Sequence, residues 1–106
     1  MSEIIKNGNQ VVVKPGQDIV ASMANEFRAE LHALVQDLPP ELIVDLTKVE
    51  MVDSVGIGVL IATHNSLNKS GGALKVTNVN KDIHKLFNTM RLDRHFSVEK
   101  RAGESS

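Results

Sequence analysis

The sequence predicts an α/β fold in one small domain, with a mixed β-sheet and helices packed on it. Two observations predict this fold: β-rich runs alternate with helical patterns after an opening hairpin, and 106 residues is an ordinary length for one domain. The order of the elements implies a sheet with a parallel centre. We expect one domain over residues 1–106, with its core at about 4–98 and a flexible tail at 99–106.

An N-terminal hairpin opens the chain. Residues 4–6 and 10–14 are β-rich runs on either side of Asn7-Gly8, which is a strong signal for a short turn. Pro15-Gly16 then ends the second strand.

A first helix is predicted from about Val20, followed by a buried strand. Asp18 or Ser22 could supply the N-cap of this helix, and Pro39-Pro40 stops it because a proline nitrogen donates no hydrogen bond. The strand at residues 41–45 contains the apolar run 42–44, which is typical of a strand covered on both faces. The apolar residues at helical spacing are Val20, Met23, Ala24, Phe27, Leu31, Leu34 and Val35.

The second half of the chain repeats the alternation of helix and strand. A helix over residues 54–69 ends at Gly71-Gly72, where a positive φ costs little, and a strand at 73–77 follows. Asn80 can cap a third helix. Residues 95–98 are a weak last strand or the start of a helix. The apolar stripe of the third helix consists of Ile83, Leu86, Phe87 and Met90.

The composition excludes several functional classes. The net charge of −1 and the three Phe as sole aromatic rings do not suit a nucleic-acid binder. The chain has no Cys, which removes thiolate chemistry and most zinc sites and fits a reducing, cytoplasmic compartment. No apolar stretch reaches the ~20 residues of a membrane span, and the start lacks a signal-peptide pattern. We therefore expect an intracellular domain without a metal ion.

The most unusual segment is the start of the second helix. Its apolar residues fall into two stripes, and a helix on a sheet buries only one, so the other is covered by a second helix or offered to a partner. Gly56 and Gly58 each cost about 1 kcal/mol within a helix relative to Ala. This cost suggests that another backbone, internal or external, approaches closely near the helix start.

Ser54 at this helix start has two interpretations. Its hydroxyl can simply cap the helix, which is a common use of serine. Alternatively it accepts a phosphate, which adds a charge of about −1.5 to −2 beside the positive helix end. The fold would tolerate that charge, whereas a docked partner would not, because desolvating a dianion is costly. Asp53 could cap the helix, orient the loop or contact a kinase.

Enzymatic interpretations are weaker. A nucleophile elbow G-x-S-x-G would need glycine where Val52 stands. His64 lies ten residues after Ser54, about 15 Å along a continuous helix, and so cannot act as its base. The four His are scattered, with no pair at i, i+4, which argues against a metal site and favours ordinary surface positions. A small enzyme or nucleotide-binding domain built on Ser54 and a histidine, such as His64 or His84, is kept only as a third hypothesis.

Residues 42–60 resemble the signature of STAS domains, more narrowly of bacterial anti-sigma factor antagonists. The segment has the pattern hydrophobic-D-L-x-x-V-x-hydrophobic-hydrophobic-D-S-x-G at the expected junction of strand and helix. Residues 71–79 and 83–96 are also similar to the family, so the resemblance covers roughly 11–98. It implies a small mixed sheet with helices packed on it, which agrees with the pattern of elements.

The resemblance implies a partner switch that regulates transcription. The unphosphorylated form would bind an anti-sigma factor that is also a serine kinase of the histidine-kinase-like ATPase type, phosphorylation of Ser54 would release it, and a PP2C-like phosphatase would restore it. Such a chain is expected not to be an enzyme and to need no cofactor or metal of its own. It would bind no nucleic acid, insert into no membrane, and be a monomer or weak dimer. The partner-binding residues would be Ser22, Asp53, Ser54, Val55, Gly56, Ile57 and Gly58.

Two positions depart from the family pattern. Many relatives have a second Ser or Thr where this chain has Val55, so a fallback acceptor is absent. Many also have Asp where this chain has Val20, and Asp18 or Ser22 could compensate in partner binding. The alternative function that the resemblance allows is a STAS interaction module of a membrane anion- or lipid-transport system, acting in trans.

Overall fold

The computed structural model describes residues 2–103. They form a five-stranded sheet in the order β1-β2-β3-β4-β5, in which β1 pairs antiparallel with β2 and the other neighbours pair in parallel. The predicted mixed sheet with a parallel centre is therefore confirmed. The elements are β1 (Ser2–Asn7), β2 (Gln10–Pro15), α1 (Ala21–Val35), β3 (Glu41–Asp45), α2 (Ser54–Lys69), β4 (Ala73–Val79), α3 (Lys81–Thr89), the 3₁₀-helix η1 (Leu92–Arg94) and β5 (Ser97–Lys100).

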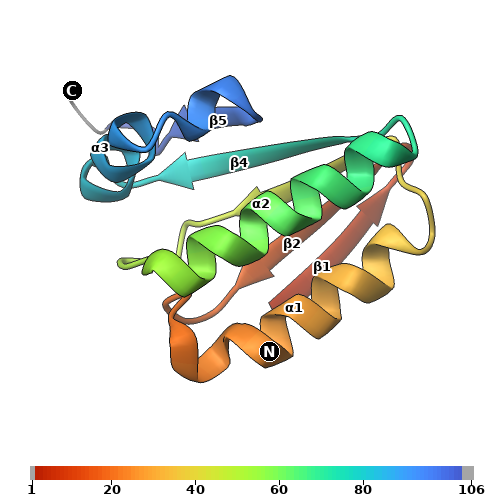
Figure 1. Ribbon diagram of the computed structural model, residues 1–106, viewed down its shortest axis with the longest axis horizontal. Helices are drawn as coiled ribbons and strands as arrows, with labels where there is room; N and C mark the ends of the chain where they lie inside the picture. Colours follow the sequence, from red (N-terminus) through yellow and green to blue (C-terminus); the bar gives the residue numbers. More distant parts are fainter. Residues whose placement is uncertain (1, 104–106) are drawn as a thin grey trace.

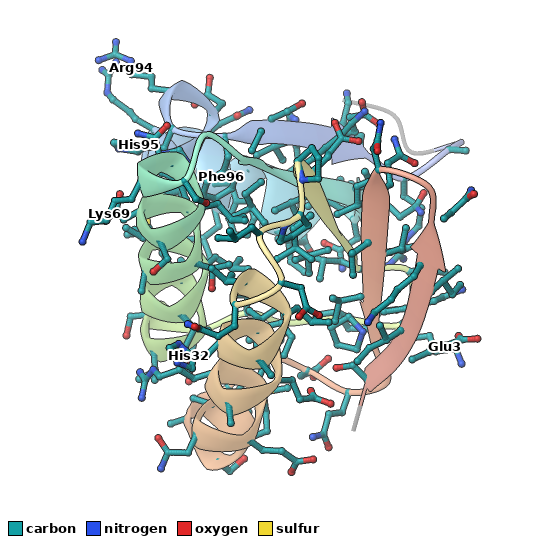
Figure 2. All side chains as sticks on the ribbon, turned by 90° about the vertical axis from the view of Figure 1, so that its right-hand side faces the viewer. Glu3, His32, Lys69, Arg94, His95 and Phe96 are labelled. Carbon is teal, nitrogen blue, oxygen red and sulfur yellow. The ribbon has the colours of Figure 1, made fainter. Side chains whose placement is uncertain are left out.

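The helices α1 and α2 lie side by side on one face of the sheet (Figures 1 and 2). Leu42 and Val44 of β3 point into this layer and are fully buried. Ile43 between them, on the opposite face, is only partly buried. The prediction that β3 is covered on both faces was therefore wrong, because the helices cover one face of the sheet at this strand.

Helix ends agree with the sequence in part. Asn80 caps α3 as predicted, since its side chain accepts a hydrogen bond from the Ile83 backbone N–H. Met90 does not belong to the buried stripe: it lies just after the last helical residue and is 46% exposed. The predicted caps of α1 were also wrong, because its N-cap residue is Val20, which provides no side-chain hydrogen bond.

The ordered core extends beyond its predicted end at residue 98. The weak strand expected near residue 95 is β5, which begins at Ser97 after the 3₁₀-helix and continues to Lys100. Arg101, expected in the flexible tail, instead donates a backbone hydrogen bond to Val79 at 2.8 Å. Residues 104–106 of that expected tail lie outside the described residues.

Candidate functional site

The carboxylate of Asp53 joins the N-terminal ends of two helices. One oxygen accepts a hydrogen bond from the Gly56 backbone N–H at 2.9 Å and so caps α2. The other oxygen accepts from the Ala21 backbone N–H of α1, also at 2.9 Å. The bond from Gly56, followed by that from Ala21, holds the pKa of Asp53 below its ordinary value. A single ionised side chain therefore fixes both helix ends.

Ser54 is the first residue of α2 and is exposed to solvent. The capping role that its hydroxyl could have taken belongs to Asp53. A hydroxyl that caps a helix accepts a hydrogen bond from a backbone N–H group, whereas the Ser54 hydroxyl has no hydrogen-bond partner among residues 2–103. It therefore lies accessible at the positive end of a sixteen-residue helix.

The two glycines near the helix start have different surroundings. A Cβ atom on Gly56 would collide with the Ile19 backbone carbonyl oxygen and would approach the Ile19 side chain to 2.8 Å. A Cβ atom on Gly58 would meet nothing within 4 Å. The predicted close approach of a second backbone is therefore confirmed at Gly56, where the segment before α1 touches α2. At Gly58 no backbone from residues 2–103 approaches.

The exposed surface beside Asp53 is largely apolar. Met51 and Val55, on either side of Asp53-Ser54, are 56% and 41% exposed. Between Asp53 and Lys69, α2 contains no Asp, Glu, Lys or Arg. Gly58 lies one turn after Ser54 and is also exposed.

Two of the predicted partner-binding residues do not reach this surface. Ile57 is only 2% exposed and packs in the core, and Gly56 is buried against the segment before α1. Their contribution is therefore to the packing of α2, because neither can offer a side chain to a partner. Met51 was missed by sequence reasoning, since its exposure depends on the direction of an irregular loop that periodicity does not describe.

Ser22 lies exposed in the first turn of α1, one residue after the Ala21 N–H that Asp53 binds. It therefore borders the same pair of helix ends as Ser54. Asp18 faces the loop before α2 instead of capping α1: it accepts hydrogen bonds from the Glu50 and Met51 backbone N–H groups. The sequence offered Ser22 and Asp18 both as caps of α1 and as residues that could compensate in partner binding. Neither caps α1, and exposed Ser22 borders the proposed site.

The histidines do not complete a catalytic group at Ser54. His64 lies in the second half of α2, where its ring contacts those of His95 and Phe96 at centroid distances of 6.0 and 5.9 Å (Figure 2 labels the latter two). Among residues 2–103 no three His, Cys, Asp or Glu side chains gather in a way that could hold a metal ion. No helix in this part of the chain is long and apolar enough to cross a membrane.

The fold and the site together define a small α/β domain that presents an exposed serine at a helix start between exposed apolar side chains. The chain belongs to the STAS domain family, whose family model matches residues 2–105. It is 29% identical over 85 residues to the anti-sigma-B factor antagonist of Bacillus subtilis, a match that covers 80% of this chain and 77% of that protein.

Solved structures share the whole fold. An anti-sigma factor antagonist from Mycobacterium paratuberculosis is 28% identical, with a TM-score of 0.82 and coverage of 93% of this chain and 84% of that one. A protein from Thermotoga maritima, described as a putative anti-sigma factor antagonist, has a TM-score of 0.88 at 19% identity, with coverage of 95% and 87%.

Two more distant structures show that this fold is used in different settings. Bacillus SpoIIAA in its phosphorylated form is 15% identical, with a TM-score of 0.72 and coverage of 92% of this chain and 90% of that one. A sulfate transporter family protein from Wolinella succinogenes is also 15% identical, with a TM-score of 0.78 and coverage of 92% and 82%. At this identity the two likenesses concern the fold alone.

Proposed function

We propose that this chain is an anti-sigma factor antagonist that works as a phosphorylation-controlled partner switch. Unphosphorylated, it binds an anti-sigma factor that is also a serine kinase of the histidine-kinase-like ATPase type. Phosphorylation of Ser54 releases that partner, and a PP2C-like phosphatase restores binding. The observation that carries the proposal is the free, exposed hydroxyl of Ser54 on an uncharged helix surface. The antagonists among its relatives support the choice of partner.

The physical basis of the switch is a change of charge on one surface. The proposed docking surface consists of Met51, Ser54, Val55 and Gly58, with Asp53 and Ser22 at its border. A phosphate on Ser54 adds a charge of about −1.5 to −2 where no ionised group lies between Asp53 and Lys69. In the free protein water and the helix end stabilise this charge. In a complex the same charge would lose its water without an opposite charge to balance it, which is strongly unfavourable.

In this proposal the chain is a binding module without catalytic activity. The kinase supplies ATP and Mg²⁺, so the chain itself needs no cofactor. Val55 leaves Ser54 without a neighbouring second acceptor. We further propose that the protein acts in the cytoplasm as a monomer or weak dimer.

The test is a pull-down from the native cytosol, with mass analysis of the peptide that contains Ser54. The bait proteins are the parent chain, Ser54→Ala and Ser54→Glu. Ser66→Glu is the matched control, because it adds the same charge to an exposed position of α2 about 18 Å further along the helix.

We expect the parent chain, Ser54→Ala and Ser66→Glu to capture a kinase, and Ser54→Glu to capture at least about tenfold less, which corresponds to about 1.4 kcal/mol of binding free energy. Equal capture by Ser54→Ala and Ser54→Glu contradicts the switch. Capture of membrane transport proteins, with no phosphate on Ser54, would instead support the transport module acting in trans.

A further inference from the structure

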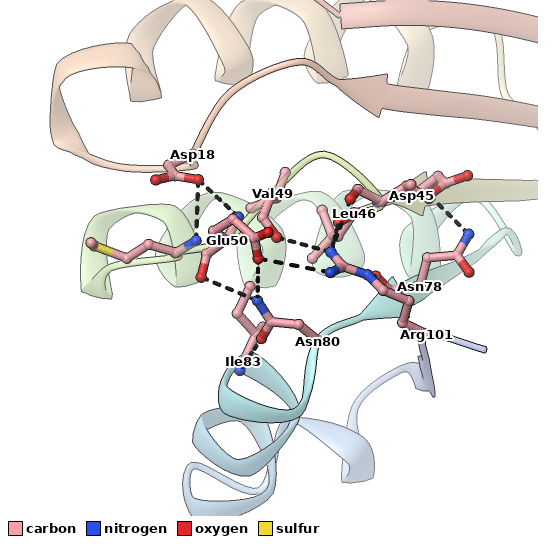
Figure 3. A network of polar contacts seen from close by, with 11 residues as sticks. Asp18, Asp45, Leu46, Val49, Glu50, Asn78, Asn80, Ile83 and Arg101 are labelled. Atoms are coloured by element: carbon pink, nitrogen blue, oxygen red, sulfur yellow. Dashed lines mark hydrogen bonds and ion pairs between the residues drawn. The ribbon is translucent and has the colours of Figure 1, made fainter. Parts of the chain in front are cut away.

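The loop before the proposed acceptor is held by side chains from distant parts of the chain. This acceptor loop, residues 46–52, connects β3 to Asp53, and only Val52 forms a β-bridge, with Ile19. Figure 3 shows that its backbone is surrounded by side chains from the segment before α1, from the start of α3 and from the end of the described chain. The buried side chains of Leu46, Val49 and Val52 anchor the loop in the core, and polar contacts with these three segments hold its backbone.

Arg101 makes the largest set of these contacts. One terminal nitrogen, Nη2, shares its two N–H groups among the carbonyl oxygens of Leu46 at 3.1 Å, Thr47 at 2.9 Å and Val49 at 3.3 Å. Its Nε donates to the carbonyl oxygen of Asn78 at 3.4 Å, at the end of β4. The side chain is only 24% exposed. The guanidinium thus links the first half of the acceptor loop to the end of β4.

Glu50 connects this group to the rest of the network. Its carboxylate accepts from Asn80 Nδ2 at 2.9 Å and lies 3.7 Å from Arg101 Nη1. The Glu50 side chain is 71% exposed, so solvent screens the ion pair and its contribution is small. The Glu50 backbone N–H donates to Asp18 at 2.8 Å. The hydrogen bonds to backbone carbonyls therefore contribute more to loop position than the ion pair does.

The network continues without a break to the acceptor. The Ile19 backbone N–H donates to the Met51 carbonyl oxygen, and the Asp53 N–H donates to the Ile19 carbonyl oxygen, both at 3.1 Å. Asp53 then fixes the starts of α1 and α2. These two backbone hydrogen bonds link Met51 to Asp53 through Ile19. A displacement of the loop at Val49 or Glu50 would therefore also shift Asp53, the residue before Ser54.

We propose that Arg101 is a positioning residue that holds the acceptor loop, and with it Met51 and Ser54, in the conformation that the kinase binds. The proposal rests on the proposed function of Ser54. The planar guanidinium directs several N–H groups at once toward neighbouring carbonyl oxygens. A lysine ammonium at the same place retains the charge but not this geometry. The residue that follows β5 therefore takes part in presenting a site that lies 47 residues earlier in the sequence.

The first measurement is native-state amide hydrogen exchange, which needs no partner. We compare the parent chain with Arg101→Gln and Arg101→Lys, and use Arg94→Gln as the matched control. Arg94 is an exposed residue of the 3₁₀-helix whose side chain points away from the molecule (Figure 2). The reporter amides are those of Val49, Glu50, Met51 and Asp53, and buried amides of β3 report global stability.

In both Arg101 variants we expect exchange at the reporter amides to be at least about tenfold faster, with the β3 amides changed much less. Arg94→Gln leaves all of them unchanged. Unchanged reporter amides in Arg101→Gln, or a uniform increase over the whole chain, overturn the proposal. Full protection in Arg101→Lys also overturns it, since charge alone would then suffice.

The second measurement is the rate of Ser54 phosphorylation by the kinase that the pull-down identifies. If the loop of Arg101→Gln is open in two thirds of the molecules, KM rises about threefold while kcat stays constant, because only the closed fraction binds. The exchange rates give the open fraction of each variant, and a KM that does not rise as the reciprocal of the closed fraction overturns the positioning role. If the parent chain itself is never phosphorylated at Ser54, the proposed function fails, while the exchange measurement still decides whether Arg101 holds the loop.

Discussion

Replacing Gly56 by Ala tests whether the close contact at the start of α2 sets both stability and site geometry. In an ordinary helix this change stabilises by about 1 kcal/mol. Here the new Cβ would collide with the Ile19 carbonyl oxygen and lie 2.8 Å from the Ile19 Cγ2 atom and 3.1 Å from the Val52 Cγ1 atom. Because backbone cannot rotate away as a flexible side chain does, the contact forces α2 and the segment before α1 apart.

The magnitude follows from three contributions. Overpacking of a core costs up to about 3 kcal/mol. The Ile19 carbonyl that must move also accepts the Asp53 backbone N–H, and loss of that hydrogen bond costs about 1 kcal/mol. Subtracting the gain of about 1 kcal/mol in helix propensity leaves a destabilisation of about 3 kcal/mol for Gly56→Ala.

Gly58→Ala is the matched control, two residues along the same helix. A Cβ there meets nothing within 4 Å, so we expect a stabilisation of about 1 kcal/mol. Urea unfolding followed by circular dichroism measures both free energies, with the slope m checked for constancy. If the two variants shift the unfolding free energy in the same direction by the same amount, the contact between Gly56 and Ile19 does not constrain this site.

Three further changes test other parts of the structure. Phe87→Ala removes a fully buried ring of α3 and is expected to lower the unfolding free energy by about 3–5 kcal/mol in the same urea assay. Asn80→Ala removes the α3 cap and is expected to cost about 1 kcal/mol, with faster amide exchange at Ile83 as its local sign. Asp53 has a lowered pKa in the folded state because it accepts hydrogen bonds from Gly56 and Ala21. Its stabilising effect is therefore present above its ordinary pKa of 3.8 and is lost as pH falls through the lower folded value. Asp53→Asn should therefore reduce the steepness of acid unfolding below about pH 4, and an unchanged steepness in a pH series of urea titrations would contradict the capping role.

Repeating patterns allowed most of the fold to be predicted. The apolar spacing placed α2 at Ser54–Lys69 and β3 at Glu41–Asp45 with the bounds that the structure has. Glycine likewise allowed two chain reversals to be predicted: the hairpin turn at Gly8, which has a φ of 62°, and the end of α2 at Gly71, which has a φ of 82°. These features depend on neighbours within a few residues, so a single sequence contains the information.

The parts that failed depend on contacts between distant segments. Asp53 and Ser54 are both good capping residues, and the second hydrogen bond that Asp53 accepts comes from Ala21, 32 residues earlier. Arg101 follows a weak strand in a polar segment, and its role depends on carbonyl groups about 50 residues earlier. Met90 fits the helical period but follows the end of α3, because the helix stops one residue earlier.

The central claim is that the chemical state of one exposed serine decides whether a second protein can bind. Its most direct test is titration calorimetry of the purified kinase partner against the unmodified chain and against the same chain phosphorylated at Ser54. We expect the unmodified chain to bind and the phosphorylated chain to have an affinity lower by at least about a hundredfold, equal to about 2.8 kcal/mol. Equal affinity of the two forms would contradict the claim.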